Sequence, residues 1–170
     1  MNLHFPSATE KKIVFAAVSE HLSKKDFEII NKDEERPWGG FFVIDETQSK
    51  KFIEIFFPGL DAATISAKRV SPKILLVQPG KRLSWQYHHR RSEIWTILSK
   101  EVSISLSETD EEKNTKIYKE NDIVIIKKGE RHRLIGLHSW GIVAEIWQHA
   151  DATNPTDEDD IVRLQDDYGR

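Results

Sequence analysis

The sequence predicts an all-β domain, an antiparallel sandwich or barrel, with an α-helical extension at its N-terminus. From residue 36 onward, apolar residues gather in short runs, and turn-forming pairs such as Pro79-Gly80 and Lys128-Gly129 separate most of them. Many short strands with frequent turns are typical of an antiparallel sandwich or barrel. The 170 residues, 38% of them hydrophobic, are enough for one buried core. We therefore expect a helical extension over residues 1–35 and one domain over residues 36–170.

The N-terminal segment has the pattern of an amphipathic helix. Ser7 and Glu10 have the spacing of a capping box, in which two side chains satisfy free amides at a helix start. Apolar residues from Ile13 to Val18 then recur at helical intervals. These signals predict one helix over residues 8–21.

The apolar runs of the main domain predict its strands. They cover Phe41–Ile44, Lys51–Phe57, Ile74–Val77, Ile94–Leu98, Val102–Leu106, Ile123–Ile126 and Ile142–Trp147. The stretch 47–57 is ambiguous, because Phe52, Ile55 and Phe56 would also fit one face of a helix. Residues 60–71 have no clear period.

Composition excludes several classes of protein. A formal net charge of −3 and a pI of about 6.2 give no basic field to recruit nucleic acid. The chain has no cysteine, which excludes disulfides, thiolate zinc sites and cysteine nucleophiles. The N-terminus does not read as a signal peptide, and no apolar stretch approaches the roughly 20 residues that span a bilayer. We expect a soluble cytoplasmic protein that binds neither membrane nor nucleic acid.

One segment, LSWQYHHRRSEIW from Leu83 to Trp95, concentrates groups capable of binding a metal. If it begins as a strand, alternation places Gln86 and His88 on one face and turns His89 away. Glu93 can face the same point from the return strand. His132, after another turn and strand, is a fourth candidate.

Two imidazoles, a carboxylate and an amide oxygen form a mixed nitrogen and oxygen donor set. Such a set suits zinc, and also manganese, iron or nickel. The alternative is that these side chains decorate a solvated hairpin. Polar groups that point into a small barrel are costly unless they are paired or coordinate a metal, which favours a divalent metal site.

The same residues resemble the two motifs of the cupin superfamily. Gly80 begins the first motif, with Gln86, His88 and Glu93 in its ligand positions, and the second motif keeps a glycine followed by His132. The resemblance implies a double-stranded β-helix, or jelly-roll barrel. Glutamine in the first ligand position, in the frame LSxQxHxxRxExW, is most similar to the isomerase domain of type II mannose-6-phosphate isomerases, also found in bifunctional mannose-1-phosphate guanylyltransferases.

Three further segments agree with that family and extend the resemblance over residues 36–170. They are Arg36–Gly39, Gly129–Leu134, and Glu158–Arg163 together with Asp167–Arg170. No glycine-rich phosphate loop precedes them, so we expect no guanylyltransferase activity.

The resemblance implies a function and a set of roles. The metal ligands would be Gln86, His88, Glu93 and His132, with zinc as the first choice of cofactor, and Arg91 falls on an arginine that the family uses for catalysis. The expected reaction is metal-dependent isomerisation of a phosphorylated sugar, most like mannose 6-phosphate to fructose 6-phosphate, in a homodimer.

Basic residues are the candidates for binding the phosphate. The planar guanidinium of Arg91 could bind the phosphate as well as stabilise an oxyanion. Lys73, Arg133 and Arg163 are the further candidates. Two alternatives stay open. One is a non-catalytic protein that binds a sugar or sugar phosphate. The other is a cupin oxygenase, which is disfavoured because such iron enzymes usually have histidine where Gln86 stands.

Overall fold

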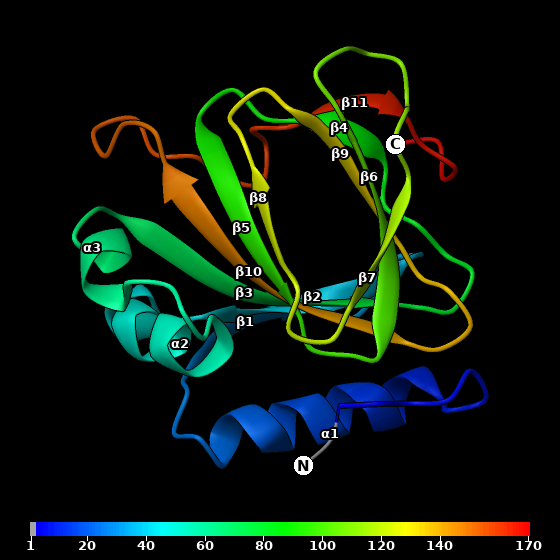
Figure 1. The fold of residues 1–170 in the computed structure, drawn as a ribbon. Coiled ribbons are helices and arrows are strands. Elements are labelled where there is room, and N and C mark those ends of the chain that lie inside the picture. Colours follow the sequence, from blue (N-terminus) through cyan, green and yellow to red (C-terminus); the bar gives the residue numbers. More distant parts are fainter. Residues whose placement is uncertain (1–2) are drawn as a thin grey trace.

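The computed structural model describes residues 3–170, and its strands form two antiparallel sheets that face each other as the walls of a barrel (Figure 1). The strands are β1 Ile29–Asp33, β2 Gly39–Ile44, β3 Val70–Val77, β4 Trp85–Tyr87, β5 Arg91–Ile97, β6 Glu101–Ser107, β7 Lys116–Lys119, β8 Ile123–Ile126, β9 Arg131–Ile135, β10 Gly141–His149 and β11 Val162–Gln165.

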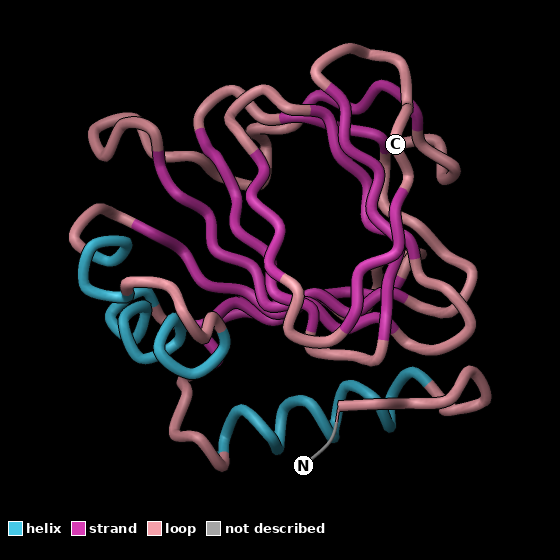
Figure 2. Tube along the Cα trace, viewed as in Figure 1, coloured by secondary structure: helices cyan, strands magenta, loops and turns pink. Residues whose placement is uncertain are grey.

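The six-stranded sheet has the order β1-β2-β3-β10-β5-β8, and the five-stranded sheet has the order β11-β4-β9-β6-β7. From β3 onward the chain alternates between the sheets, except that β7 stays beside β6. Figure 2 shows the two sheets as opposite walls. This arrangement confirms the predicted jelly-roll barrel of a cupin.

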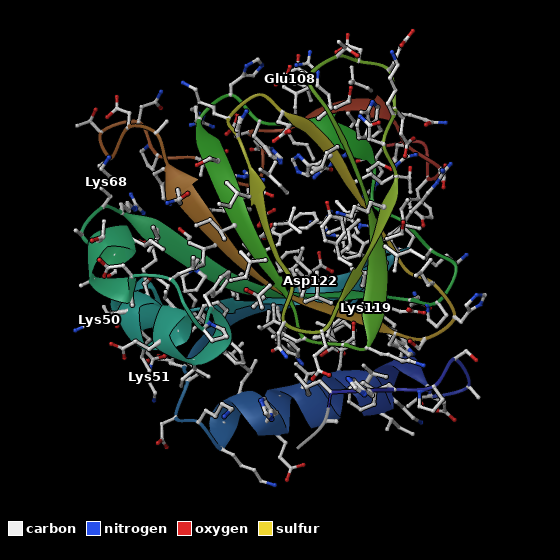
Figure 3. All side chains as sticks on the ribbon, in the orientation of Figure 1. Lys50, Lys51, Lys68, Glu108, Lys119 and Asp122 are labelled. Atoms are coloured by element: carbon white, nitrogen blue, oxygen red, sulfur yellow. The ribbon has the colours of Figure 1, made fainter. Side chains whose placement is uncertain are left out.

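Strand β3 shows how the core is divided, because all of its residues are buried. Ile74 and Leu76 belong to a cluster shared with the helices on the outer face of the six-stranded sheet. Leu75 and Val77 belong to a second cluster between the two sheets. Side chains therefore fill much of the space that the ribbons enclose, whereas charged residues such as Lys50 lie at the periphery (Figure 3). Two buried faces explain why this strand is almost continuously apolar.

The N-terminal helix is present, but its predicted start is wrong. Helix α1 spans Lys11–Ser23, with Glu10 at the N-cap position and no side-chain capping bond. The segment before it instead forms a turn, in which the backbone amide of Thr9 donates to the Pro6 carbonyl. Phe15 of α1 packs on Phe42 of β2 with ring centroids 5.4 Å apart, so tertiary packing stabilises the helix without the cap.

The ambiguous stretch is helical, so of the two interpretations that its pattern allowed, the helix is confirmed and the strand is not. A 3₁₀ turn, η1 Glu46–Gln48, leads into α2 Ser49–Phe56, and α3 Ala62–Ser66 follows. Phe52, Ile53 and Phe56 form the buried face of α2, whereas Ile55 is 38% exposed.

The remaining apolar runs lie in β2, β3, β5, β6, β8 and β10, as predicted. The short strands β1, β7, β9 and β11 were not among the predicted runs. Strand β1 lies within the range expected to be a helical extension, so the sheet begins at Ile29. Within residues 3–170, none of the helices combines the length and apolar character needed to cross a membrane.

Candidate metal centre

The four predicted ligands come from both sheets, and His88, Glu93 and His132 meet inside the barrel. Gln86 in β4 and His132 in β9 are direct cross-strand partners. His88 directly follows β4, and Glu93 faces them from β5 of the opposite sheet. All four side chains are buried. Atoms of His88, Glu93 and His132 that could bind a metal lie within 4.8 Å of one another, so these three residues form a candidate metal site.

Hydrogen bonds orient both histidines in the same way. The Nδ1 of His88 donates to the Asp160 carbonyl at 2.5 Å, and the Nδ1 of His132 donates to the Glu130 carbonyl at 3.0 Å. Their Nε2 atoms lie 3.3 and 3.4 Å from different carboxylate oxygens of Glu93. In a neutral ring that donates from Nδ1, the Nε2 atom carries a lone pair. The Nε2 lone pairs of His88 and His132 therefore face the negatively charged Glu93 carboxylate.

This arrangement fits a bound cation. The Nε2 atom of His132 is buried and has no hydrogen-bond partner among residues 3–170. Leaving such an atom unsatisfied costs free energy. Metal–ligand bonds of roughly 2.0–2.2 Å in a tetrahedral site place ligand atoms about 3.3–3.6 Å apart. Each Nε2 atom lies at such a distance from one oxygen of Glu93, although the two histidines face different oxygens. The three residues thus meet the requirements of a divalent metal.

The protonation states also suit metal binding. Burial lowers the pKa of His88 to about 3, although the Glu93 carboxylate opposes the shift. Burial alone would raise the pKa of Glu93, but the charge and the hydrogen bond of Arg91 outweigh it and hold that pKa below its usual range. A neutral imidazole and an ionised carboxylate are the forms that bind metals.

Arg91, the predicted catalytic residue, lies directly against this site. Its Nε donates to Glu93 at 2.7 Å, and one terminal nitrogen lies 3.1 Å from the Nε2 of His88. The other terminal nitrogen donates to the Thr156 hydroxyl at 2.9 Å. The guanidinium carbon lies 3.7 Å from the ring centroid of Trp147. These contacts fix the guanidinium plane beside the ligand atoms.

The segment 150–161, which joins β10 to β11, braces the site from outside. The Asp160 carboxylate accepts hydrogen bonds from the backbone amides of His89 and Arg90, each at 3.0 Å. It also accepts a bond from the Thr156 hydroxyl at 2.6 Å. Because Asp160 and Thr156 also bond His88 and Arg91, this segment determines how the site residues are oriented.

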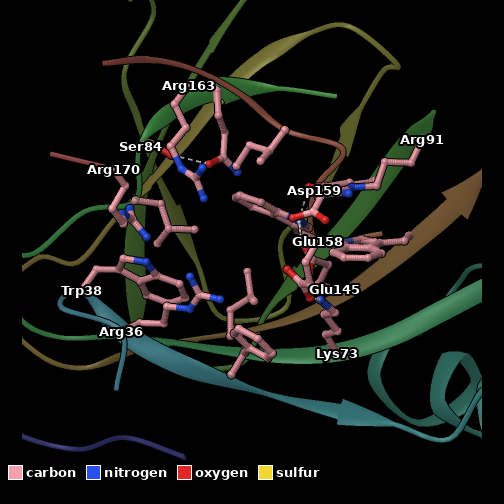
Figure 4. A pocket seen from close by; sticks show the side chains of 18 residues that line it. Arg36, Trp38, Lys73, Ser84, Arg91, Glu145, Glu158, Asp159, Arg163 and Arg170 are labelled. Atoms are coloured by element: carbon pink, nitrogen blue, oxygen red, sulfur yellow. Dashed lines mark hydrogen bonds and ion pairs between the residues drawn. The ribbon is translucent and has the colours of Figure 1, made fainter. Parts of the chain in front are cut away.

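The site opens into a cavity of about 310 Å³, whose lining includes Gln86, Arg91 and Glu93. Charge is unevenly distributed around it. Three acidic side chains gather on one side, where Lys73 and Arg91 also lie, and three arginines lie on the other (Figure 4). The acidic residues are Glu145, Glu158 and Asp159, and the arginines opposite them are Arg36, Arg163 and Arg170.

Glu145 of β10 is a cavity residue that the sequence interpretation missed. It is 4% exposed, and its carboxylate accepts a bond from the indole of Trp95 at 3.1 Å. Burial and the neighbouring Glu93 carboxylate raise its pKa to about 8, against the opposing effects of Lys73 and Arg91. A single carboxyl within the apolar run Ile142–Trp147 was the signal that could have identified it.

Two of the residues predicted to bind the phosphate, Lys73 and Arg133, lie in different places relative to the cavity. Lys73 lines the cavity, is paired with Glu158, and lies over the Trp147 ring with Nζ 3.5 Å from its centroid. Arg133 is not part of the cavity, which corrects the expectation that it binds substrate. It points out of the barrel and donates to Glu112 at 2.6 Å, because alternation along β9 turns it away when His132 faces inward.

Comparison with known proteins agrees with this architecture. The family model described as mannose-6-phosphate isomerase C-terminal matches residues 23–166. The chain belongs to this family. The match begins within the predicted helical extension and includes every strand.

This family member is similar to longer curated proteins. It is 26% identical over 147 residues to mannose-1-phosphate guanylyltransferase 2 of Escherichia coli O157:H7, covering 86% of this chain and 25% of that protein. It is 30% identical over 135 residues to the alginate biosynthesis protein AlgA of Pseudomonas aeruginosa, covering 79% of this chain and 22% of that protein. The chain thus spans about a quarter of the length of these relatives.

Solved structures share the fold with this family member at low sequence identity. KdgF from Halomonas sp. matches with a TM-score of 0.52 and 10% identity, over 76% of this chain and 91% of that one. Vicilin from tomato matches with a TM-score of 0.52 and 12% identity, over 94% of this chain and 35% of that one. These likenesses concern the fold alone.

Proposed function

We propose that the chain is a metal-dependent aldose–ketose isomerase of a phosphorylated sugar, with mannose 6-phosphate and fructose 6-phosphate as the substrate pair. The proposal rests on one observation. In a chain of the mannose-6-phosphate isomerase C-terminal family, the buried set His88, Glu93 and His132 lies beside a polar cavity large enough for a small ligand.

The proposed metal ligands are His88, Glu93 and His132, with Gln86 as the fourth. Zinc is the first candidate, and manganese, iron or nickel would also accept these nitrogen and oxygen donors. A bound divalent ion would act as a Lewis acid toward the oxygens of the two reacting carbons.

Glu145 is the proposed proton-transfer group. Isomerisation removes a proton from the second carbon of the aldose and delivers one to the first carbon, so one carboxylate can act as base and then as acid. General acid–base catalysis works best when the pKa lies near the operating pH. The position of Glu145 in the cavity wall and the burial that raises its pKa support this role.

Arg91 is proposed to stabilise negative charge on the substrate oxygens. Proton removal leaves an enediolate, and a fixed guanidinium beside it lowers the energy of that charge without reorganisation. Its bonds to Glu93 and Thr156 hold it in place before substrate arrives.

Metal analysis and an assay of sugar-phosphate interconversion test the proposal together. The purified protein should contain close to one metal ion per chain and should convert mannose 6-phosphate to fructose 6-phosphate. His132→Ala should lose both properties. His138→Ala is the matched control, because that histidine is exposed and should leave both unchanged. A metal-loaded protein that binds sugar phosphates but converts none of them would refute the isomerase proposal and favour a binding protein.

A further inference from the structure

We propose that Arg36, Arg163 and Arg170 form an anion site that receives the phosphate group of the substrate and so fixes its direction in the cavity. This inference rests on the proposed function and deepens it. The three arginines lie together on the wall opposite Glu145 and Glu158 (Figure 4).

Two of the arginines are held in position by carboxylates. Arg36 lies 2.7 Å from Asp33, and Arg170 donates to both oxygens of Asp166, at 3.0 and 2.9 Å. These pairs leave other N–H groups of each guanidinium free to bind a ligand, since each carries five. The ion pairs therefore position the side chains without using up their donors.

Arg163 lacks such a partner. It makes no ion pair and no side-chain hydrogen bond within residues 3–170, although it lines the cavity beside two other arginines. Burial first, and then the charges of Arg170 and Arg36, lower its pKa. Because Asp33 and Asp166 pair with the other two arginines, the uncompensated positive charge of the cluster is that of Arg163. An anionic ligand would remove the mutual repulsion of the three guanidinium groups and accept bonds in the planar geometry that arginine offers to phosphate.

Strand register links this cluster to the metal centre. Arg163 in β11 is the cross-strand partner of Gln86 in β4, and Gln86 is the partner of His132 in β9. Directly opposed residues of neighbouring strands project from the same face of a sheet. Arg163 and His132 are therefore separated by two strand spacings, on the order of 10 Å. An elongated ligand can contact both, such as an open-chain hexose with its phosphate at one end and its carbonyl at the other.

The opposite wall would not accept the phosphate. Its basic residues are Lys73 and Arg91. Glu158 already pairs with Lys73, and burial lowers the pKa of that lysine. The Arg91 guanidinium is already bonded to Glu93 and Thr156. Glu145 and Asp159 line the same side and would repel an anion whenever they are ionised. The asymmetry of charge thus directs the phosphate to the arginines and the reacting carbons toward the metal ligands and Glu145.

Arg163→Gln tests the site. Arg69→Gln is the matched control, because Arg69 is exposed, forms a single ion pair with Glu46 and lies outside this cavity. Calorimetric titration of the metal-loaded proteins with inorganic phosphate should show about 10- to 100-fold weaker binding in Arg163→Gln only, as expected for loss of a charged hydrogen-bond donor. The KM for mannose 6-phosphate should rise by a similar factor while kcat is largely kept.

The outcomes separate this inference from the proposed function. Equal phosphate affinity in wild type and Arg163→Gln, or no binding to either, overturns the anion site even if the wild type is an isomerase. Selective loss of phosphate binding in Arg163→Gln supports the site even if no sugar phosphate is converted, in which case only the isomerase proposal fails. Because Arg163 is exposed, both variants should melt at the wild-type temperature, which keeps the comparison independent of folding.

Discussion

Replacing Glu145 by glutamine should stabilise the metal-free protein in alkaline solution, because it removes a buried carboxyl group that resists ionisation. The pKa of Glu145 is about 8 in the folded protein, against an ordinary value of 4.5. Between these values the unfolded chain has released the proton while the folded chain keeps it. Unfolding then becomes easier as the pH rises. Above pH 8 the accumulated cost is on the order of 5 kcal/mol, since each pKa unit corresponds to about 1.4 kcal/mol.

Urea unfolding at pH 5 and pH 9, after removal of metal with a chelator, measures this effect. Chelation matters because a cation beside Glu93 would favour the ionised form of Glu145. The stability of Glu145→Gln relative to wild type should increase between the two pH values by a few kcal/mol. Glu54→Gln is the control, because the Glu54 side chain is 54% exposed and should show no such trend. A relative stability that is equal at both pH values, or lower at pH 9, would refute the reasoning.

If Glu145 transfers the proton in the proposed isomerisation, the same substitution should lower turnover by the metal-loaded protein by about 10²- to 10⁴-fold. Arg91→Lys should lower kcat by about 10²- to 10³-fold, because lysine lacks the planar fork, while metal content measured by mass spectrometry is unchanged. Phe52→Ala should destabilise the protein by about 3–5 kcal/mol in urea unfolding, because that ring is fully buried under α2, whereas Ile55→Ala on the exposed side should cost far less. Gly39→Ala should abolish soluble folded protein, because φ is +148° and a Cβ atom would lie 1.8 Å from a carbonyl oxygen of β3. Gly59→Ala, with open space around it, should still fold.

The grouping of the ligand residues was predictable from the sequence because it depends on strand alternation. Once Ser84 to His88 is treated as extended, Gln86 and His88 must share a face and His89 must point away. The structure places His89 at the surface and the other two side chains inside. The same rule applied to β9 would have turned Arg133 outward as soon as His132 was placed inward.

Other parts of the site depend on register between distant strands, which a single sequence does not specify. Glu145 reaches the metal centre only because β10 lies between β3 and β5, which aligns it with Lys73 and Trp95. Arg163 meets Gln86 only through the pairing of β11 with β4. Likewise, α2 was ambiguous because a short apolar run fits either a strand or a helix, and packing against the sheet decides between them.

The bracing segment 150–161 has a thermodynamic consequence. It bonds His88 through a carbonyl and Arg91 through a hydroxyl, so its ordered conformation and the metal-competent arrangement of the site favour each other. Coupling of this kind is reciprocal. Removing the metal should loosen this loop, which a protease would detect as faster cleavage between β10 and β11. Conversely, a break in the loop should weaken metal affinity although the loop contributes no ligand side chain. The protease sensitivity of segment 150–161 would then indicate whether a metal is bound, although this segment supplies no ligand to the metal.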